Sequence, residues 1–378
     1  MKKFVSLLLS TILLAGLLSM PAMAVDVKAP SAILMECATG EILMEKNSHE
    51  MLHPASVTKV MTLLLLAEAL EVGQISWQDT VTTSAFAASK GGSQIFLEEG
   101  EQMKLEEMFK SVVIASANDC ATALAEHLCG SEEAFVEKMN ARAQELGMEN
   151  THFVNCTGLD DDPEAKNHLT TAYDIAIMSR ELLRHPKVKQ YTTVWMDTVR
   201  DGAFGLTNTN KLVRFYPGAT GLKTGFTAAA GYCLSASAEK EGMELLAVVM
   251  HCDTSVNRFE SAKALLNYGF AQYALYTPPT NSISPIPITL GTEDSITPVV
   301  EGGGPILTEK ALKNAITIRT ETVENLQAPV EEGQKVGTLT VEAQGKVLRE
   351  IPLVAGKNVP RLSIWKLWWR LVGKLCMA

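Results

Sequence analysis

Three short polar motifs in this chain contain the residue types that nucleophilic catalysis needs. The first holds Ser56 and Lys59, three residues apart at the expected start of a helix, so both side chains lie on one face. A serine hydroxyl is a poor nucleophile until a base takes its proton, and Lys59 can be that base only if it is neutral. Burial in an apolar helix and a nearby cation would both lower the lysine pKa. Taken alone, Ser56 is more simply explained as a helix N-cap, so the pair needs support from the other motifs.

The second and third motifs supply polar groups that such a nucleophile would use. Ser116 and Asn118 stand at the start of a helix after an apolar run, where the hydroxyl could relay a proton and the amide could bind a substrate carbonyl. Both could also be a simple helix cap and a first-turn polar residue. Lys223, Thr224 and Gly225 are expected on an edge strand. The cation and the hydroxyl could bind a carboxylate, and the glycine would let a substrate backbone approach closely.

Other kinds of chemistry fit the sequence poorly. The segment 218–224 superficially resembles a phosphate-binding loop, but Leu222 precedes the lysine where that motif needs glycine. The seven histidines are scattered and none forms an HExxH motif, so we expect no metal and no cofactor. The formal net charge of -10 argues against nucleic acid as a partner.

The hydrophobic pattern indicates the elements that would position the motifs. Residues 56–70 are apolar on nearly every face and contain no glycine or proline, which predicts a buried helix. Residues 31–36 and 41–45 predict a hairpin, and residues 221–252 predict three more strands. Further helices are expected over residues 105–114, 118–127, 132–146, 172–183 and 258–268. An antiparallel sheet built from both ends of this region, with helices packed on it, fits this order.

The chain divides into four expected regions. Residues 1–24 read as a cleaved secretory signal, with two lysines, an apolar run and a small-residue cleavage site. A retained membrane anchor is the alternative, although the apolar run is short for a full span. Because 378 residues are too many for one comfortable core, we expect two domains. Residues 25–276 would form the helix-and-sheet domain. Residues 277–358, with short alternating runs and a hairpin around Gln344, would form a small all-β sandwich domain.

The last region, residues 359–378, is expected to be an amphipathic membrane-anchoring helix. Arg361, Lys366, Arg370 and Lys374 accompany three tryptophans and a broad apolar face, a combination typical of segments that lie in a membrane interface. The segment is too short and too charged to span a bilayer. The alternative is a helix docked on the β domain.

Seven cysteines occur, and no CxxC pair is among them. The odd number leaves at least one unpaired in a monomer. Most lie in apolar surroundings, so we expect buried small hydrophobic residues rather than a disulfide framework.

In this order, the three motifs resemble those of the serine-type D-alanyl-D-alanine carboxypeptidases, the low-molecular-mass penicillin-binding proteins of peptidase family S11. The resemblance covers nearly the whole mature chain. Its matching segments are residues 54–59, 91–93, 96–100, 116–119, 158–160, 171–174 and 221–227. It implies an α/β (α+β) fold with a β-lactamase/transpeptidase-like domain, whose antiparallel sheet is flanked by helices, followed by the β domain. It also implies that Ser56 attacks the carbonyl between the two terminal D-alanines of a peptidoglycan pentapeptide, and that water then hydrolyses the acyl-enzyme.

The resemblance assigns further roles. The backbone N–H groups of Ser56 and Phe226 would form the oxyanion hole, and Arg258 is the candidate for an arginine near the substrate carboxylate. β-Lactam antibiotics would be covalent inhibitors. The protein would be exported and lie peripherally on the outer face of the cytoplasmic membrane. Cys120 departs from the family pattern, where alanine is more familiar, and is either a harmless exchange or a thiol close to the site.

Two rival functions remain open. A class A-type β-lactamase shares the three motifs, but it needs a glutamate with an asparagine four residues later, and here Glu164 and Asn167 are three apart. A non-catalytic penicillin-binding cell-wall protein would be expected to have broken motifs, and all three are intact.

Overall fold

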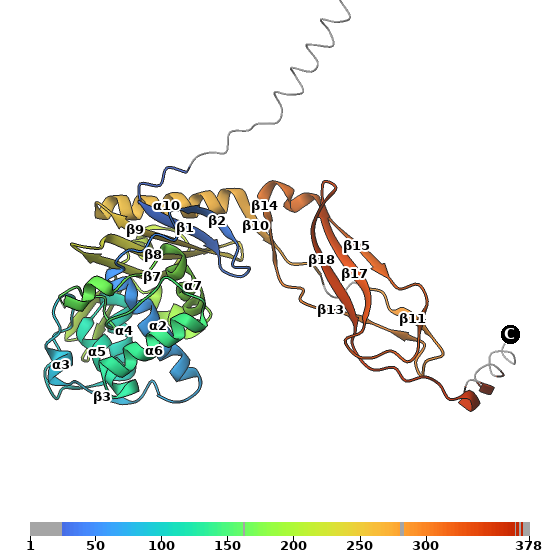
Figure 1. Ribbon diagram of the computed structural model, residues 1–378, viewed down its shortest axis with the longest axis horizontal. Helices are drawn as coiled ribbons and strands as arrows, with labels where there is room; N and C mark the ends of the chain where they lie inside the picture. The colour runs from blue at the N-terminus through green and yellow to red at the C-terminus, as the bar shows by residue number, and fades with distance from the viewer. Residues whose placement is uncertain (1–24, 162, 280–282, 367, 370–371, 373–378) are drawn as a thin grey trace, which may run out of the picture.

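The computed structural model describes residues 25–161, 163–279, 283–366, 368–369 and 372. The expected signal segment therefore lies outside the described residues, as does much of the expected terminal helix. The described chain forms a helix-and-sheet region followed by an elongated β region (Figure 1).

A five-stranded antiparallel sheet organises the larger region. Two strands come from the start of the chain, β1 (Ser31–Glu36) and β2 (Ile42–Lys46). Three come from much later, β7 (Ala219–Thr227), β8 (Gly231–Lys240) and β9 (Met243–Cys252). The order is β2-β1-β9-β8-β7. The pairing of β1 with β9 therefore joins the two early strands to the three later ones. The prediction of an antiparallel sheet built from both ends of the region is confirmed, and β7 is an edge strand as expected.

Helices cover both faces of this sheet. The long helix α10 (Ser255–Gln272) packs along β8 and β9 on one face (Figure 1). The opposite face carries α2 (Lys59–Glu71) and α7 (Ala172–Leu183). The other helices on this side are α3 (Ala85–Ala88), α4 (Leu105–Ala115), α5 (Asn118–Cys129), α6 (Glu132–Glu145) and α8 (Pro186–Thr192). The short helix α9 (Leu212–Phe215) lies on the α10 side, where Leu212 shares a buried cluster with Phe259 and Leu265. The long helices lie close to their predicted bounds, whereas the short helices α3, α8 and α9 were not predicted.

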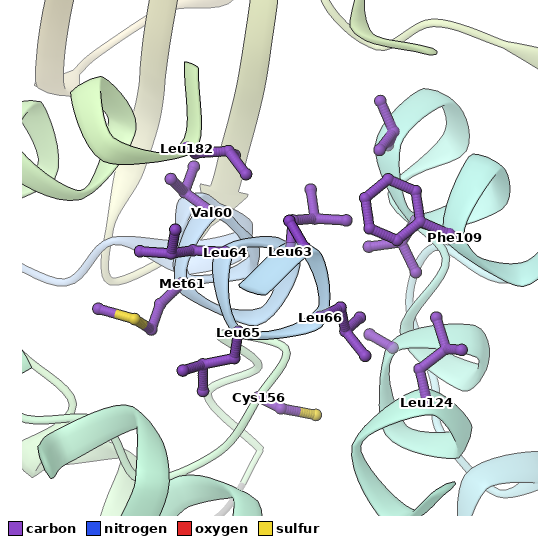
Figure 2. Close-up of a cluster of buried hydrophobic side chains, with 14 of the residues drawn as sticks. Val60, Met61, Leu63, Leu64, Leu65, Leu66, Phe109, Leu124, Cys156 and Leu182 are labelled. Carbon is purple, nitrogen blue, oxygen red and sulfur yellow. The ribbon is translucent and has the colours of Figure 1, made fainter. Parts of the chain in front are cut away.

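Helix α2 is the centre of the main core. Its side chains are apolar on every face, and all residues from Lys59 to Ala67 are buried. Figure 2 shows Leu63 and Leu66 directed toward Phe109 and Leu124, while other α2 side chains fan out in the remaining directions. Because each fully buried leucine contributes about 1.5–3 kcal/mol, this helix anchors the motif at its N-terminus strongly.

Small two-stranded elements complete the region. Strands β3 (Thr80–Thr82) and β4 (Gln102–Lys104) pair with each other, as do β5 (Met196–Val199) and β6 (Phe204–Thr207). The β5–β6 hairpin leads into Thr209, whose N–H donates to the Ile114 carbonyl at the end of α4. The hairpin therefore connects to the helix that precedes Ser116.

The second region is built mainly of strands, as predicted. One sheet has the order β13-β18-β17-β15, and a smaller one has the order β12-β11-β16. Their bounds are β11 (Ile286–Thr289), β12 (Ser295–Ile296), β13 (Pro298–Val300), β15 (Ile316–Thr322), β16 (Leu326–Gln327), β17 (Lys335–Ala343) and β18 (Lys346–Ala355). The β17–β18 hairpin turns at Gln344 and Gly345, which both have positive φ, as a type I′ hairpin turn requires.

Strand pairing links the two regions. Strand β10 (Tyr273–Tyr276) follows α10 directly and pairs antiparallel with β14 (Ile306–Glu309). A short 3-10 helix, η3 (Lys310–Ala315), then leads into the larger β sheet. The junction is therefore hydrogen-bonded as well as covalent.

Six of the seven cysteines lie in the described residues, and all six are free thiols. Cys120, Cys156, Cys233 and Cys252 are buried, which agrees with the expectation of small hydrophobic residues. Cys376 lies outside the described residues.

No helix within the described residues combines the length and the apolar character that crossing a membrane requires.

Candidate active site

Ser56 lies in a one-turn 3-10 helix, η1 (Ala55–Thr58), that runs directly into α2. The expected continuous helix is therefore divided at Lys59. Ser56 is partly exposed, whereas Val57 and Thr58 are buried. The residues at the N-cap positions of η1 and α2 are Pro54 and Thr58, and neither makes a side-chain cap bond. Ser56 is therefore not an N-cap, and the simpler explanation of its presence does not hold.

Lys59 points back along the turn toward Ser56. Its Nζ lies 2.9 Å from Ser56 Oγ and 2.8 Å from the carbonyl oxygen of Thr157. Burial lowers the pKa of Lys59 from 10.5 to about 7, while Cys156 and Asp119 act in the opposite direction. At neutral pH a large fraction of Lys59 is thus unprotonated, and it is placed to accept the Ser56 proton.

Lys223, on the edge strand β7, is a second buried cation of the site. Its Nζ donates to the Thr224 carbonyl at 3.0 Å. Burial, followed by the charges of Lys59 and Arg258, holds the pKa of Lys223 well below its usual value. The expected cation effect is therefore seen on Lys223, whereas burial is the cause that lowers the pKa of Lys59. Thr224 is also partly engaged, since its Oγ1 donates to Thr209 Oγ1 at 2.7 Å.

Gly225 allows a close contact within the protein. A Cβ at this position would lie 2.6 Å from the Pro54 carbonyl oxygen and 3.1 Å from the Val57 nitrogen. Glycine thus lets β7 pass directly against η1, while the expected approach of a substrate backbone stays a prediction. The next residue, Phe226, is 55% exposed and its ring lies 4.3 Å from that of Tyr232.

Ser116 and Asn118 occupy the junction between α4 and α5. Ser116 ends α4 in the left-handed conformation at φ 65° and is buried. The Asn118 N–H donates to the Ser93 carbonyl, and its Nδ2 donates to the Gly91 carbonyl, both at 2.7 Å. Asn118 Oδ1 is buried without a hydrogen-bond partner. In this structure the Asn118 amide therefore holds the 91–93 loop, and its substrate-binding role stays a prediction.

Arg258, in the first turn of α10, is buried near β7. Its Nη1 donates to the Gly225 carbonyl at 3.1 Å and to the Cys233 carbonyl at 3.4 Å. The guanidinium lies 5.3 Å from the Tyr232 ring centre, and its buried Nε has no hydrogen-bond partner. Arg258 thus supports the carbonyl of Gly225, and its expected contact with a substrate carboxylate stays a prediction.

The segment that supplies the hydrogen-bond acceptor for Lys59 could not be predicted from the sequence. Asn155 Oδ1 accepts the Gly158 N–H at 2.6 Å and the Thr157 N–H at 3.2 Å. Glu132 accepts the Cys156 N–H at 2.9 Å. These bonds fix the Thr157 carbonyl beside Lys59. A backbone carbonyl has no sequence signal, although segment 158–160 was noted for its family resemblance.

A second missed residue is Asp119, which is fully buried. Its carboxylate accepts the N–H groups of Ile95 at 3.0 Å, Leu97 at 3.1 Å and Cys120 at 2.9 Å. It therefore fixes the loop that follows Ser93. Burial raises the pKa of the Cys120 thiol well above its usual value, so Cys120 is a buried small residue and not a reactive thiol.

No cluster of three or more histidine, cysteine or acidic residues suited to a metal ion occurs among the residues that the structure describes.

Comparisons with known proteins agree on one family. Residues 19–254 match the family described as D-alanyl-D-alanine carboxypeptidase, and residues 281–361 match the C-terminal domain of penicillin-binding protein 5. The chain is 42% identical to the Bacillus subtilis D-alanyl-D-alanine carboxypeptidase DacF over 92% of this chain and 90% of that one. It is 33% identical to DacC of Escherichia coli, over 92% and 88%.

Solved structures give the same result. Penicillin-binding protein 5 from Haemophilus influenzae superposes with a TM-score of 0.78 at 30% identity, over 90% of this chain and 100% of that one. Penicillin-binding protein D2 from Listeria monocytogenes, in an ampicillin-bound form, has a TM-score of 0.57 at 31% identity, over 66% and 100%.

Proposed function

Because the chain belongs to the D-alanyl-D-alanine carboxypeptidase family, peptidase S11, we propose that it removes the terminal D-alanine from peptidoglycan pentapeptides through an acyl-enzyme on Ser56. As a member of this family it is a hydrolase, a carboxypeptidase and a penicillin-binding protein. The observation that carries the proposed mechanism is the 2.9 Å contact between Lys59 Nζ and Ser56 Oγ.

Acylation begins when neutral Lys59 takes the Ser56 proton and Oγ attacks the carbonyl carbon between the last two D-alanines. The backbone N–H groups of Ser56 and Phe226 hold the oxyanion that forms. Ser116 relays this proton from Lys59 to the leaving amine, the C–N bond breaks, and D-alanine departs, which leaves Lys59 neutral again. Water then attacks the ester while Lys59 accepts its proton. Lys59 passes that proton to Ser56 Oγ as the ester C–O bond breaks, which releases the shortened peptide and free Ser56.

The substrate carboxylate is bound by Lys223, Thr224 and Arg258. An anion beside Lys223 favours its charged form, so substrate binding itself would restore the proton that burial disfavours. Asn118 contributes to binding the peptide beside Ser116. β-Lactam antibiotics acylate the same serine, and this is supported by the ampicillin-bound form of the Listeria monocytogenes relative.

Neither rival function has comparable support. The β-lactamase alternative needs a glutamate that activates water, but Glu164 and Asn167 are exposed on η2 (Pro163–Asn167) and bonded to each other at 3.0 Å. A non-catalytic role does not account for a buried lysine of lowered pKa in contact with Ser56.

Export and membrane attachment belong to the same proposal. Residues 1–24 act as a cleaved signal, residues 25–276 catalyse, and residues 277–358 form a second domain. Residues 359–378 hold the enzyme on the outer face of the cytoplasmic membrane, near its wall substrate. This is supported by large exposed apolar side chains at Ile364 (79%), Trp365 (74%) and Trp369 (67%).

The decisive test is mass spectrometry of a peptidoglycan pentapeptide incubated with purified protein, with Ser56→Ala as the control. We expect loss of one alanine with the wild-type protein and none with the variant. Fluorescent penicillin should label Ser56 and remain attached. Cross-linked dimers would instead point to transpeptidation, rapid turnover of the drug would favour a β-lactamase, and an unchanged peptide would contradict the catalytic proposal.

A further inference from the structure

His168 is a buried histidine that no sequence motif singled out. It is 3% exposed, and both ring nitrogens have partners. Nδ1 lies 3.2 Å from the Val154 nitrogen, and Nε2 lies 2.8 Å from Thr58 Oγ1. A backbone N–H can only donate, so Nδ1 must be the acceptor. In the neutral ring, Nε2 therefore carries the proton and donates to Thr58.

The surroundings of His168 keep this ring neutral. Burial, followed by the charges of His53 and His152, lowers the pKa of His168 to about 3. The Phe153 ring packs edge-on against it at 5.7 Å. Protonation would turn Nδ1 into a donor facing the Val154 N–H, which would break that bond. The ring is therefore neutral around pH 7, and both contacts are made by the tautomer protonated on Nε2.

The two partners of His168 lie in the two segments that hold the Lys59 amine, which are the Ser56 turn and the 154–157 segment. Thr58 stands between Ser56 and Lys59 in the turn from η1 to α2. Val154 begins the segment that ends at Thr157, whose carbonyl accepts Lys59 Nζ at 2.8 Å. The same surfaces touch again at Gly158, where a Cβ would lie 2.7 Å from Thr58 Oγ1.

We infer that His168 is a positioning residue for acylation: its imidazole joins the Ser56 turn to the 154–157 segment and so holds Lys59 Nζ between Ser56 Oγ and the Thr157 carbonyl. The inference rests on the roles proposed above for Ser56 and Lys59. His168 itself contacts neither of their reacting atoms in the hydrogen bonds described, so it acts through Thr58 and Val154.

Paired substitutions at His168 separate the two bonds. Asparagine places an acceptor near Nδ1 but no donor near Nε2, whereas glutamine places an amide donor near Nε2. We expect His168→Asn to slow acylation of Ser56 by fluorescent penicillin about a hundredfold, because displacing a reacting group by about 1 Å has effects of this size. His168→Gln should restore the rate to within about tenfold of wild type. Thr58→Val removes the other end of the bond and should behave like His168→Asn.

Two further measurements distinguish positioning from loss of stability. For pentapeptide hydrolysis, His168→Asn should lower kcat with little change in KM. Its acidic limb should also move to higher pH, since a loosened pocket hydrates Lys59 and raises its pKa. The matched control is His185→Asn. His185 is another buried histidine, stands at the start of α8, and has its Nδ1 2.9 Å from a Glu71 carboxylate oxygen. This variant should lose thermal stability without slowing acylation.

The outcomes are distinct. Slow acylation in His168→Asn and Thr58→Val, with rescue by His168→Gln, supports the inference. Wild-type acylation rates in both Thr58→Val and His168→Asn would overturn it while leaving Ser56 and Lys59 in place. If Ser56 of the wild-type protein is never labelled, the proposed function fails and this inference fails with it. If the His168 variants do not fold, the acylation rate of Thr58→Val decides alone. A slow rate supports the inference, and a wild-type rate overturns it.

Discussion

Lys59 shows how a single side chain acquires reactivity from burial. Lysine is almost never fully buried, because its ammonium group loses hydration in a protein interior. Here it is enclosed at the start of the central helix, with Ser56 Oγ and the Thr157 carbonyl as its polar contacts. The low pKa that follows from burial makes Lys59 a usable base at neutral pH. Burial of Lys59 also lowers the stability of the native state at every pH at which this lysine would be protonated in the unfolded chain.

The rate of Ser56 acylation should therefore depend on pH through Lys59. Because only the neutral amine accepts the serine proton, the rate should rise with pH and level off above a midpoint near the Lys59 pKa of about 7. Lys59→Ala should reduce acylation by about 10²- to 10⁴-fold, the usual contribution of a general base. Stopped-flow measurement with fluorescent penicillin from pH 5 to pH 9, roughly spanning that midpoint, would check both.

A matched stability measurement serves as the control. The pKa of Lys59 is about 7 in the folded protein and 10.5 for an ordinary lysine, which is the value expected in the unfolded chain. Between about pH 7 and pH 10.5, the unfolded chain therefore binds more protons than the folded protein. Stability due to this group should rise with pH across that window, by on the order of 1 kcal/mol per pH unit, and Lys59→Met should lack the rise. A rate profile that is flat around neutrality would contradict the assignment of Lys59 as base.

At the scale of elements, the nucleophile turn is held between two segments that are distant in the sequence. Strand β7 contacts η1 at Gly225. The 154–157 segment is followed by Gly158, which also contacts η1. A Cβ at Gly158 would lie only 1.9 Å from the Ala55 carbonyl oxygen. Both glycines thus permit backbone-to-backbone packing around Ser56.

Gly225→Ala should therefore impair catalysis as well as stability. The added methyl group must displace β7 from Pro54, and with it Lys223, Thr224 and the Phe226 N–H. We expect acylation to fall about a hundredfold, with a lower thermal midpoint. Gly205→Ala, on β6, is the control, because its Cβ would meet nothing within 4 Å and its φ is not positive. Equal acylation rates in the two variants would show that the contact of β7 with η1 is dispensable.

At the scale of the whole molecule, the β region is attached to the catalytic region by β10 and β14 as well as by the chain itself. The expected boundary after residue 276 falls at the end of β10, so a strand assigned to the first region pairs with one from the second. The β region extends away from the sheet and helices that hold Ser56 (Figure 1). In the function proposed above, the β region would separate the catalytic region from residues 359–378 at the membrane.

Deleting residues 361–378 should therefore separate attachment from chemistry. We expect the shortened protein to acylate Ser56 at the wild-type rate in solution. Its binding to vesicles of phosphatidylglycerol and phosphatidylethanolamine should fall at least about tenfold, since it loses four cations, each worth about 1 kcal/mol near an anionic surface, as well as the tryptophans. Co-sedimentation measures this. A full-length variant with Trp365, Trp368 and Trp369 changed to serine is the matched control, and equal vesicle binding by all three proteins would contradict the membrane proposal.

The sequence by itself determined the features that depend on local pattern. The apolar run after Ser56 specified α2, the alternating runs specified the antiparallel sheet and the β region, and the motif order specified the family. Only the tertiary structure decided how Lys59 is held, why position 225 is glycine, and that His168 joins the Ser56 turn to the 154–157 segment. These features depend on backbone carbonyls and on contacts between segments some 100 residues apart, such as Lys59 and Thr157, which differ by 98 positions. A backbone carbonyl is the same at every residue, so nothing in the order of side chains reveals which one will accept the lysine.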